Sequence, residues 1–177
     1  MDKIVLKKLF TLAIAAFVYN ISCAQVNFKA PVISVDSIEI DAPIVKVWET
    51  LYKIKNWNEK FDFIEKTIVA DSIVVGTKFK WKTKSLKINS NVLVVNNQQQ
   101  LCWTGSKYGV KVFHNWLFKP LPNGKVLLIS QESQQGLFAS LFKKKFNKSV
   151  KDGSIKWLIQ IKNYAENIKI SSYTNNN

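Results

Sequence analysis

One histidine and one glutamate are the residues of this chain whose types and spacing could support acid–base chemistry. His114 is the only histidine of the 177 residues, and Glu132 falls on the strand expected to follow it. An imidazole titrates near neutral pH, and burial raises the pKa of a carboxyl toward the same range, so the pair could exchange a proton with a substrate. The more ordinary interpretation, which we prefer from the sequence, is a hydrogen-bonded strand histidine and a solvated glutamate.

Several other catalytic chemistries lack their residues in this chain. A single histidine excludes a two-histidine zinc motif, and Cys102 is the only cysteine after residue 24, which excludes a thiolate cluster and a disulfide framework. The sequence contains no Gly-x-Ser-x-Gly elbow and no glycine-rich phosphate loop. We therefore expect no bound metal and no cofactor. The absence of these catalytic motifs also favours a protein that is not an enzyme.

Aromatic side chains are plentiful, with 6 Trp and 11 Phe. Rings on the predicted strands, and those in the loop near the expected mouth of a cavity, are candidates to touch an apolar ligand. The candidate ligand-binding residues are Trp57, Phe61, Phe63, Phe79, Trp81, Trp103, His114, Trp116, Glu132 and Phe142. For each strand or loop ring, a cavity wall and ordinary hydrophobic core are equal alternatives.

The chain has 26 basic and 12 acidic residues, which gives a formal charge of +14. None of the basic residues is arginine, so all of the fixed positive charge is carried by lysine. Lysine is a point charge without the planar fork that reads guanine edges, so we expect no specific nucleic-acid recognition. Near the C-terminal end, apolar and basic residues adjoin, which is typical of transient contact with an anionic membrane surface or, alternatively, of a solvated helix face. They are Phe138, Leu141, Phe142, Lys143, Lys144, Lys145 and Lys148.

Residues 1–24 are typical of a cleavable signal peptide. Three lysines precede an uncharged, mostly apolar run at 9–19, which is too short for a convincing membrane span. Cleavage after Ala24 would follow the small residues that a signal peptidase requires, and it predicts an exported protein, periplasmic or secreted. The alternative is a lipoprotein cleaved before Cys23 and anchored through it.

A periodicity of two along the middle of the chain predicts antiparallel strands joined by short turns. The expected strands are 32–40, 64–69, 78–84, 86–95, 100–105, 110–119 and 125–133. After the first strand, Asp41-Ala42-Pro43 predicts the start of a short helix with Asp41 as its cap and Pro43 in its first turn.

Apolar residues at helical spacing predict helix at the C-terminal end. Phe138, Phe142, Phe146 and Val150 step by four, then Trp157, Ile161, Tyr164 and Ile168 continue the stripe, and Gly153 is a possible break between two helices. Strands gathered together with helices at the ends predict an α+β fold, a curved antiparallel sheet wrapped around a long C-terminal helix with an internal cavity. We expect one domain at 25–170 and a disordered polar tail at 171–177.

Residues from about 33 to 167 resemble the START-like (SRPBCC) superfamily, in its polyketide cyclase/dehydrase branch. The resemblance rests on Ile40-Asp41-Ala42-Pro43 with Val47-Trp48, on Asn56-Trp57-Asn58 with Phe63-Ile64, and on Leu101, Trp103, Gly105, His114, Phe118, 120–124 and 132–137. Glu59-Lys60 stands where the family usually has a proline. The resemblance implies the helix-grip fold and a hydrophobic ligand between sheet and helix, with catalysis there in a minority of members.

The preferred hypothesis is an exported, non-catalytic binder or carrier of a hydrophobic small molecule that is lipid-, terpenoid- or polyketide-like. The alternative is a cyclase or dehydratase that uses His114 and Glu132. A third hypothesis is a basic surface protein that binds membrane or nucleic acid through lysine. Nothing in the sequence indicates an oligomeric state.

Overall fold

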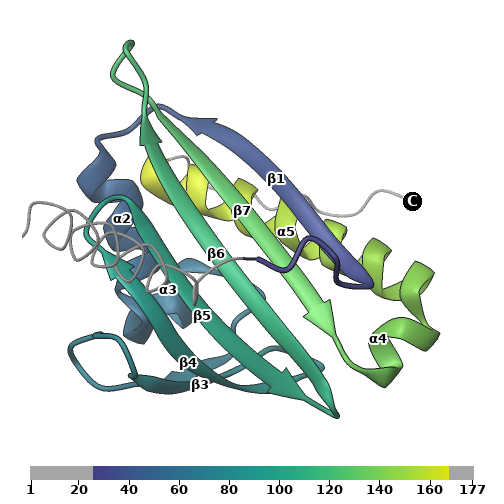
Figure 1. Ribbon diagram of the computed structural model, residues 1–177. Coiled ribbons are helices and arrows are strands. Elements are labelled where there is room, and N and C mark those ends of the chain that lie inside the picture. Colours follow the sequence, from purple (N-terminus) through teal and green to yellow (C-terminus); the bar gives the residue numbers. More distant parts are fainter. Residues whose placement is uncertain (1–25, 168–177) are drawn as a thin grey trace, which may run out of the picture.

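The computed structural model describes residues 26–167 (Figure 1). The expected signal peptide, its processing at Cys23 or Ala24, Ile168 and the polar tail at 171–177 lie outside the described residues. Within them, no helix is long and apolar enough to cross a membrane.

One sheet of seven antiparallel strands forms the body of the molecule, in the spatial order β1-β7-β6-β5-β4-β3-β2. The strands are β1 (Val32–Ile40), β2 (Lys66–Ile68), β3 (Lys78–Lys82), β4 (Lys87–Asn96), β5 (Gln100–Lys107), β6 (Val110–Pro120) and β7 (Val126–Gln135). In β3 the lysines are exposed while Phe79 is buried and Trp81 half-buried, as the alternating sequence predicts for a strand with one covered face. β1 has the predicted bounds, and β4 to β7 lie within about two residues of theirs.

Two predicted element boundaries before the C-terminal region are wrong. The strand expected at 64–69 is reduced to β2, because Ile64 turns into the core and its backbone N–H donates to the Phe61 carbonyl. Asp41 does not cap the following helix, α2 (Ile44–Tyr52). Pro43 occupies the N-cap position and its carbonyl accepts the first helical hydrogen bonds, while the backbone N–H of Asp41 donates to the Glu166 carboxylate at 2.6 Å.

The C-terminal region divides at Phe142 and not at Gly153. A short helix, α4 (Leu137–Leu141), precedes α5 (Lys143–Ala165), which runs through Gly153 without a break. Trp157 and Ile161 of α5 are buried against the sheet and α2. Burying each side chain contributes roughly 2 kcal/mol, which exceeds the roughly 1 kcal/mol that one helical glycine costs.

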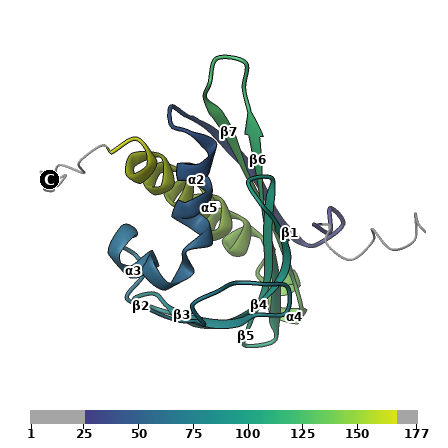
Figure 2. The same cartoon turned by 90° about the vertical axis from the view of Figure 1, so that its left-hand side faces the viewer.

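The sheet bends around its helices. Figure 2 shows α2, α3 (Trp57–Lys60) and α5 together on the concave side of the sheet. A short 3₁₀ turn, Ile54–Asn56, links α2 to α3. The main core therefore lies between the sheet and these helices, and α3 carries Trp57 into its middle.

Candidate functional site

Trp57 lies at the centre of a group of aromatic rings between the sheet and α5. Its indole N–H donates to the Leu51 carbonyl at 2.9 Å, which fixes the ring. The ring centroid is 5.7 Å from that of Phe79 on β3, 5.5 Å from Trp103 on β5 and 5.1 Å from Trp157 on α5. These are edge-to-face and tilted contacts of the kind that aromatic side chains prefer. Both layers of the fold thus contribute rings to one site.

Phe63 and Trp81 form the partly exposed edge of this group. The Phe63 ring lies 4.8 Å from that of Trp157, and the ammonium of Lys156 lies over it at 5.0 Å. The indole N–H of Trp81 donates to the Ser90 hydroxyl at 3.1 Å. We call the whole set the aromatic cluster: Trp57, Phe61, Phe63, Phe79, Trp81, Trp103, Trp116 and Trp157. Its inner members are buried, and its edge is where a small molecule would first meet it.

The rings of the aromatic cluster fill the space that the sequence predicts as a cavity. Trp57, Phe61, Phe79, Trp103 and Trp116 are each at most 2% exposed. Two hollows of about 750 and 780 Å³ lie elsewhere for the most part, one at α4 and α5 and one along β2 to β6, and Phe79 is the member of the aromatic cluster that lines the second. A ligand between sheet and helix would therefore take space by moving rings at the cluster's edge.

His114 and Glu132 are directly opposite one another on β6 and β7, as the sequence hypothesis requires. The distance from His114 Nδ1 to Glu132 Oε2 is 3.6 Å. His114 Nε2 lies 3.0 Å from the hydroxyl of Ser130, and the amide of Gln134 donates to Glu132 Oε1 at 2.7 Å. We call these four residues the polar cluster. The His114 ring lies 5.0 Å from that of Trp103, so the polar and aromatic clusters are contiguous.

Burial controls the protonation of this pair. It lowers the pKa of His114 to about 3, because the charged imidazolium would lose its water. It raises the pKa of Glu132 to about 7, against the opposing effect of the Gln134 hydrogen bond. The solvated glutamate of the ordinary interpretation is wrong, since only 14% of the Glu132 side chain is exposed. Near neutral pH, Glu132 is the member of the pair that can take up or release a proton.

Two buried polar atoms, one within the polar cluster and one beside it, have no hydrogen-bond partner among the described residues. They are Nε1 of Trp116, a donor, and Oε1 of Gln134, an acceptor. A buried polar atom without a partner costs about 1–3 kcal/mol, so each atom favours any ligand that supplies its partner. Such a pairing would place one acceptor and one donor of the ligand near His114.

The interior next to the polar cluster is closed by α5. Lys151 forms an ion pair with Asp36 of β1, and the Ser34 hydroxyl donates to the same carboxylate at 2.5 Å. Burial raises the pKa of Asp36, but the bonds from Lys151 and Ser34 outweigh it and hold that pKa below its usual value. Asp36 is therefore a structural anion, and Glu132 remains the titrating carboxyl of the site. Across residues 26–167, no group of three His, Cys, Asp or Glu side chains could hold a metal ion.

The structure brings together nine of the ten predicted site residues and leaves out Phe142, which is exposed at the junction of α4 and α5. Lys143, Lys144, Lys145 and Lys148 are exposed on the first turns of α5. Sequence reasoning missed Trp157, Ser130 and Gln134 as site residues. Ser130 and Gln134 lie two positions either side of Glu132, so strand alternation alone would have placed them on its face.

No family model and no curated protein sequence matches the chain. Solved structures do match it. A hypothetical protein of Helicobacter pylori is similar at a TM-score of 0.70 and 18% identity, over 81% of this chain and 98% of its own. An aromatase/cyclase of Streptomyces sp. R1128 gives 0.65 and 13%, over 76% and 93%. Norcoclaurine synthase of Thalictrum flavum gives 0.62 and 13%, over 77% and 95%.

This chain has the helix-grip fold. The curved antiparallel sheet closed on a long C-terminal helix matches the aromatase/cyclase over most of both chains, which confirms the fold that the START-like resemblance implies. At 13–18% identity the likeness concerns the fold, and the chemistry has to be argued from the two clusters.

Proposed function

We propose that this chain binds a ring-bearing hydrophobic small molecule between the sheet and α5 and acts as its carrier. The observation that carries the proposal is the contiguity of the two clusters. An apolar wall with a few convergent polar groups is the usual composition of a small-molecule site. Here the wall is aromatic, and the polar groups are His114, Ser130 and Glu132.

The chemistry of the ligand follows from the site. Flat, unsaturated molecules pack on rings at 4.5–7 Å, so a polyketide- or terpenoid-like ring system suits the aromatic cluster better than a flexible acyl chain. A carbonyl on the ligand would accept from Trp116 Nε1, and a hydroxyl would donate to Gln134 Oε1. The resemblance to the polyketide cyclase/dehydrase branch supports the same class of ligand.

Native mass spectrometry of the protein from its own cells tests the proposal. We expect a discrete adduct, released by solvent extraction, with a conjugated or aromatic ring system. The same spectrum tests the proposed export, since cleavage after Ala24 gives a chain that begins at Gln25. A lipid-modified Cys23 at the N-terminus would favour the lipoprotein alternative. A chain that carries no adduct and also fails to take up neutral aromatic probes would contradict the carrier proposal.

The second candidate is an enzyme, favoured by one observation, the distance of 3.6 Å within a buried His114–Glu132 pair. With a pKa of about 7, Glu132 could abstract a proton from a poly-β-carbonyl substrate, while neutral His114 donates or accepts a hydrogen bond. Turnover should then rise with pH through about 7 and be lost in Glu132→Gln. Equal turnover in the wild type, Glu132→Gln and His114→Ala would remove this candidate.

A further inference from the structure

One end of the molecule exposes a group of large apolar side chains that the proposed ligand site does not use. We call them the α4 patch: Tyr108, Leu137, Phe138, Leu141 and Phe142. Tyr108 is 75% exposed, Leu137 70% and Leu141 65%. Scattered exposed apolar residues are ordinary, but a contiguous set marks a surface that meets something apolar.

The backbone holds the α4 patch in its exposed position. Gly136, which precedes α4, has φ of +128° and lies so close to the β5–β6 turn that an added Cβ would be 2.4 Å from the Gly109 carbonyl oxygen. Ala139 is fully buried with Val32 and Val110. The helix is thus seated on the sheet by its smallest apolar side chain, and this seating leaves its leucines and phenylalanines outside.

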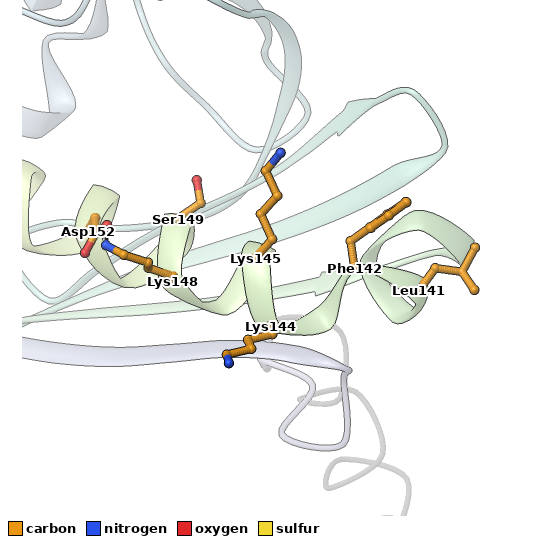
Figure 3. A pocket seen from close by; sticks show the side chains of 7 residues that line it. All are labelled: Leu141, Phe142, Lys144, Lys145, Lys148, Ser149 and Asp152. Atoms are coloured by element: carbon orange, nitrogen blue, oxygen red, sulfur yellow. Dashed lines mark hydrogen bonds and ion pairs between the residues drawn. The ribbon is translucent and has the colours of Figure 1, made fainter.

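Unpaired lysines border the α4 patch. Lys148 pairs with Asp152, and Lys151 with Asp36. Lys143, Lys144 and Lys145 have no ion-pair partner among the described residues. Figure 3 shows Leu141 and Phe142 at the turn into α5, with Lys144 and Lys145 directed to opposite sides of its first turn.

Leu141 and Phe142 also line the open hollow of about 750 Å³ at the start of α5, together with Lys144, Lys145 and Lys148. Its lining combines apolar surface with ammonium groups, and Asp152, which pairs with Lys148, supplies its carboxylate. An acyl chain against the apolar part and a phosphate against the ammonium groups would satisfy both. A phospholipid offers these two chemistries in one molecule.

We propose that this end of the molecule docks on an anionic lipid bilayer, with the α4 patch in the interface and Lys143, Lys144 and Lys145 on the lipid phosphates. Charge decides between this occupant and a second copy of the chain. A symmetric contact between two α4 patches would bring the same unpaired lysines face to face, whereas an anionic bilayer neutralises them. The inference does not rest on the proposed ligand of the aromatic cluster.

A polarity-sensitive fluorophore at a single thiol tests the docking on the full chain. Leu141→Cys and Val75→Cys are matched reporters in a Cys23→Ser background, since Leu141 and Val75 are similarly exposed. The loop of Val75 is held against α2 by the Tyr52 hydroxyl, which donates to the Ile73 carbonyl. Ile73 packs in the main core with α2, whereas Ala139 of α4 packs in a separate cluster. Cys102 stays unlabelled because burial raises the pKa of its thiol to about 12.

With vesicles of phosphatidylcholine and phosphatidylglycerol, the reporter at 141 should shift to an apolar environment and the reporter at 75 should not. Pure phosphatidylcholine or high salt should weaken the shift, because screening shortens the range of the charges. Equal shifts at the two positions, or none at 141, would overturn the proposal. A shift at 141 that grows with protein concentration without vesicles would overturn it in favour of a second copy.

A charge-matched pair of variants separates this surface from net charge. A lysine near an anionic surface contributes about a fivefold gain in partitioning, so Lys144→Gln with Lys145→Gln should weaken vesicle binding by roughly 25-fold. Lys78→Gln with Lys80→Gln removes the same charge from the exposed side of β3 and should leave binding nearly unchanged. Equal losses in the two double variants would show that only total charge matters and would contradict a docking site at α4.

Discussion

The chemistry of single residues in this protein depends on burial more than on residue type. His114 and Glu132 are an ordinary pair of side chains in the sequence, and the surrounding rings remove their water. Their pKa values are displaced in opposite directions, to about 3 and about 7. Both displacements favour the neutral form, so the folded protein holds an uncharged pair where the unfolded chain near pH 5.5 would hold two charges.

The opposite pKa displacements of Glu132 and His114 predict two opposing contributions to the pH dependence of the free energy of unfolding. The raised pKa of Glu132 means that the folded state binds more protons between about pH 4.5 and 7, so its contribution to stability is lost as pH rises through that window. The lowered pKa of His114 has the opposite sign, and stability is lost as pH falls from 6.5 toward 3. Between pH 4.5 and 6.5 the two slopes, each about 1.4 kcal/mol per pH unit, should cancel.

Replacing one residue of the pair should reveal the pH dependence of stability that the other residue contributes. Relative to the wild type, Glu132→Gln should gain stability as pH rises from 4.5 to 6.5, and His114→Gln should lose stability over the same range. Urea unfolding at a series of pH values measures both differences. Parallel curves for the wild type and both variants would show that the pair is solvated, contrary to the buried geometry.

At the scale of elements, strands with alternating apolar and polar residues could be predicted from the sequence. The position of α4 on the sheet could not. β1 and β3 were foreseeable because one face of each meets the core and the other meets water. Phe138, Phe142 and Val150 form one helical stripe in the sequence, yet only Val150 is buried. The stripe fails because α4 is positioned by the approach of Gly136 to Gly109, a contact between distant segments that no local periodicity contains.

The candidate site also combines a feature that could be predicted from the sequence with one that could not. Opposed positions on β6 and β7 bring His114 to Glu132, as adjacent strands imply. The position of Trp57 depends on a 3₁₀ turn and a four-residue helix, and the N–H of its ring donates to a carbonyl six residues earlier. The sequence therefore left open whether each ring was wall or core, because the answer lies in how far the sheet bends.

Two glycines should respond to alanine in opposite directions. Gly153→Ala should stabilise the protein by about 1 kcal/mol, because the new Cβ meets no atom within 4 Å and alanine favours a helix. Gly136→Ala should destabilise it, because φ of +128° and the Gly109 carbonyl at 2.4 Å exclude a Cβ. Chemical denaturation midpoints of the pair give the comparison. A loss of stability in Gly153→Ala would mean that α5 is interrupted there, as the sequence suggested.

At the scale of the whole molecule, two apolar features lie in different places and have different surroundings. The aromatic cluster is internal and adjoins the polar cluster, while the α4 patch is external and is bordered by unpaired lysines. No lysine among residues 26–167 is buried, so their positive charge bears on the surface that the protein approaches and not on the proposed ligand.

The indole N–H signals of the six tryptophans give the most direct test of the internal site. During titration with a neutral polycyclic aromatic probe, ¹⁵N spectra should show saturable shifts at Trp57, Trp103, Trp116 and Trp157. The ring of Trp48 packs on Tyr52 and Phe118, which are not members of the aromatic cluster, and its signal should change least. Phe63→Ala should weaken the response and Phe28→Ala, an exposed control, should not. Indole signals that stay unchanged at saturating probe, or change alike in both variants, would contradict a ligand between the sheet and α5.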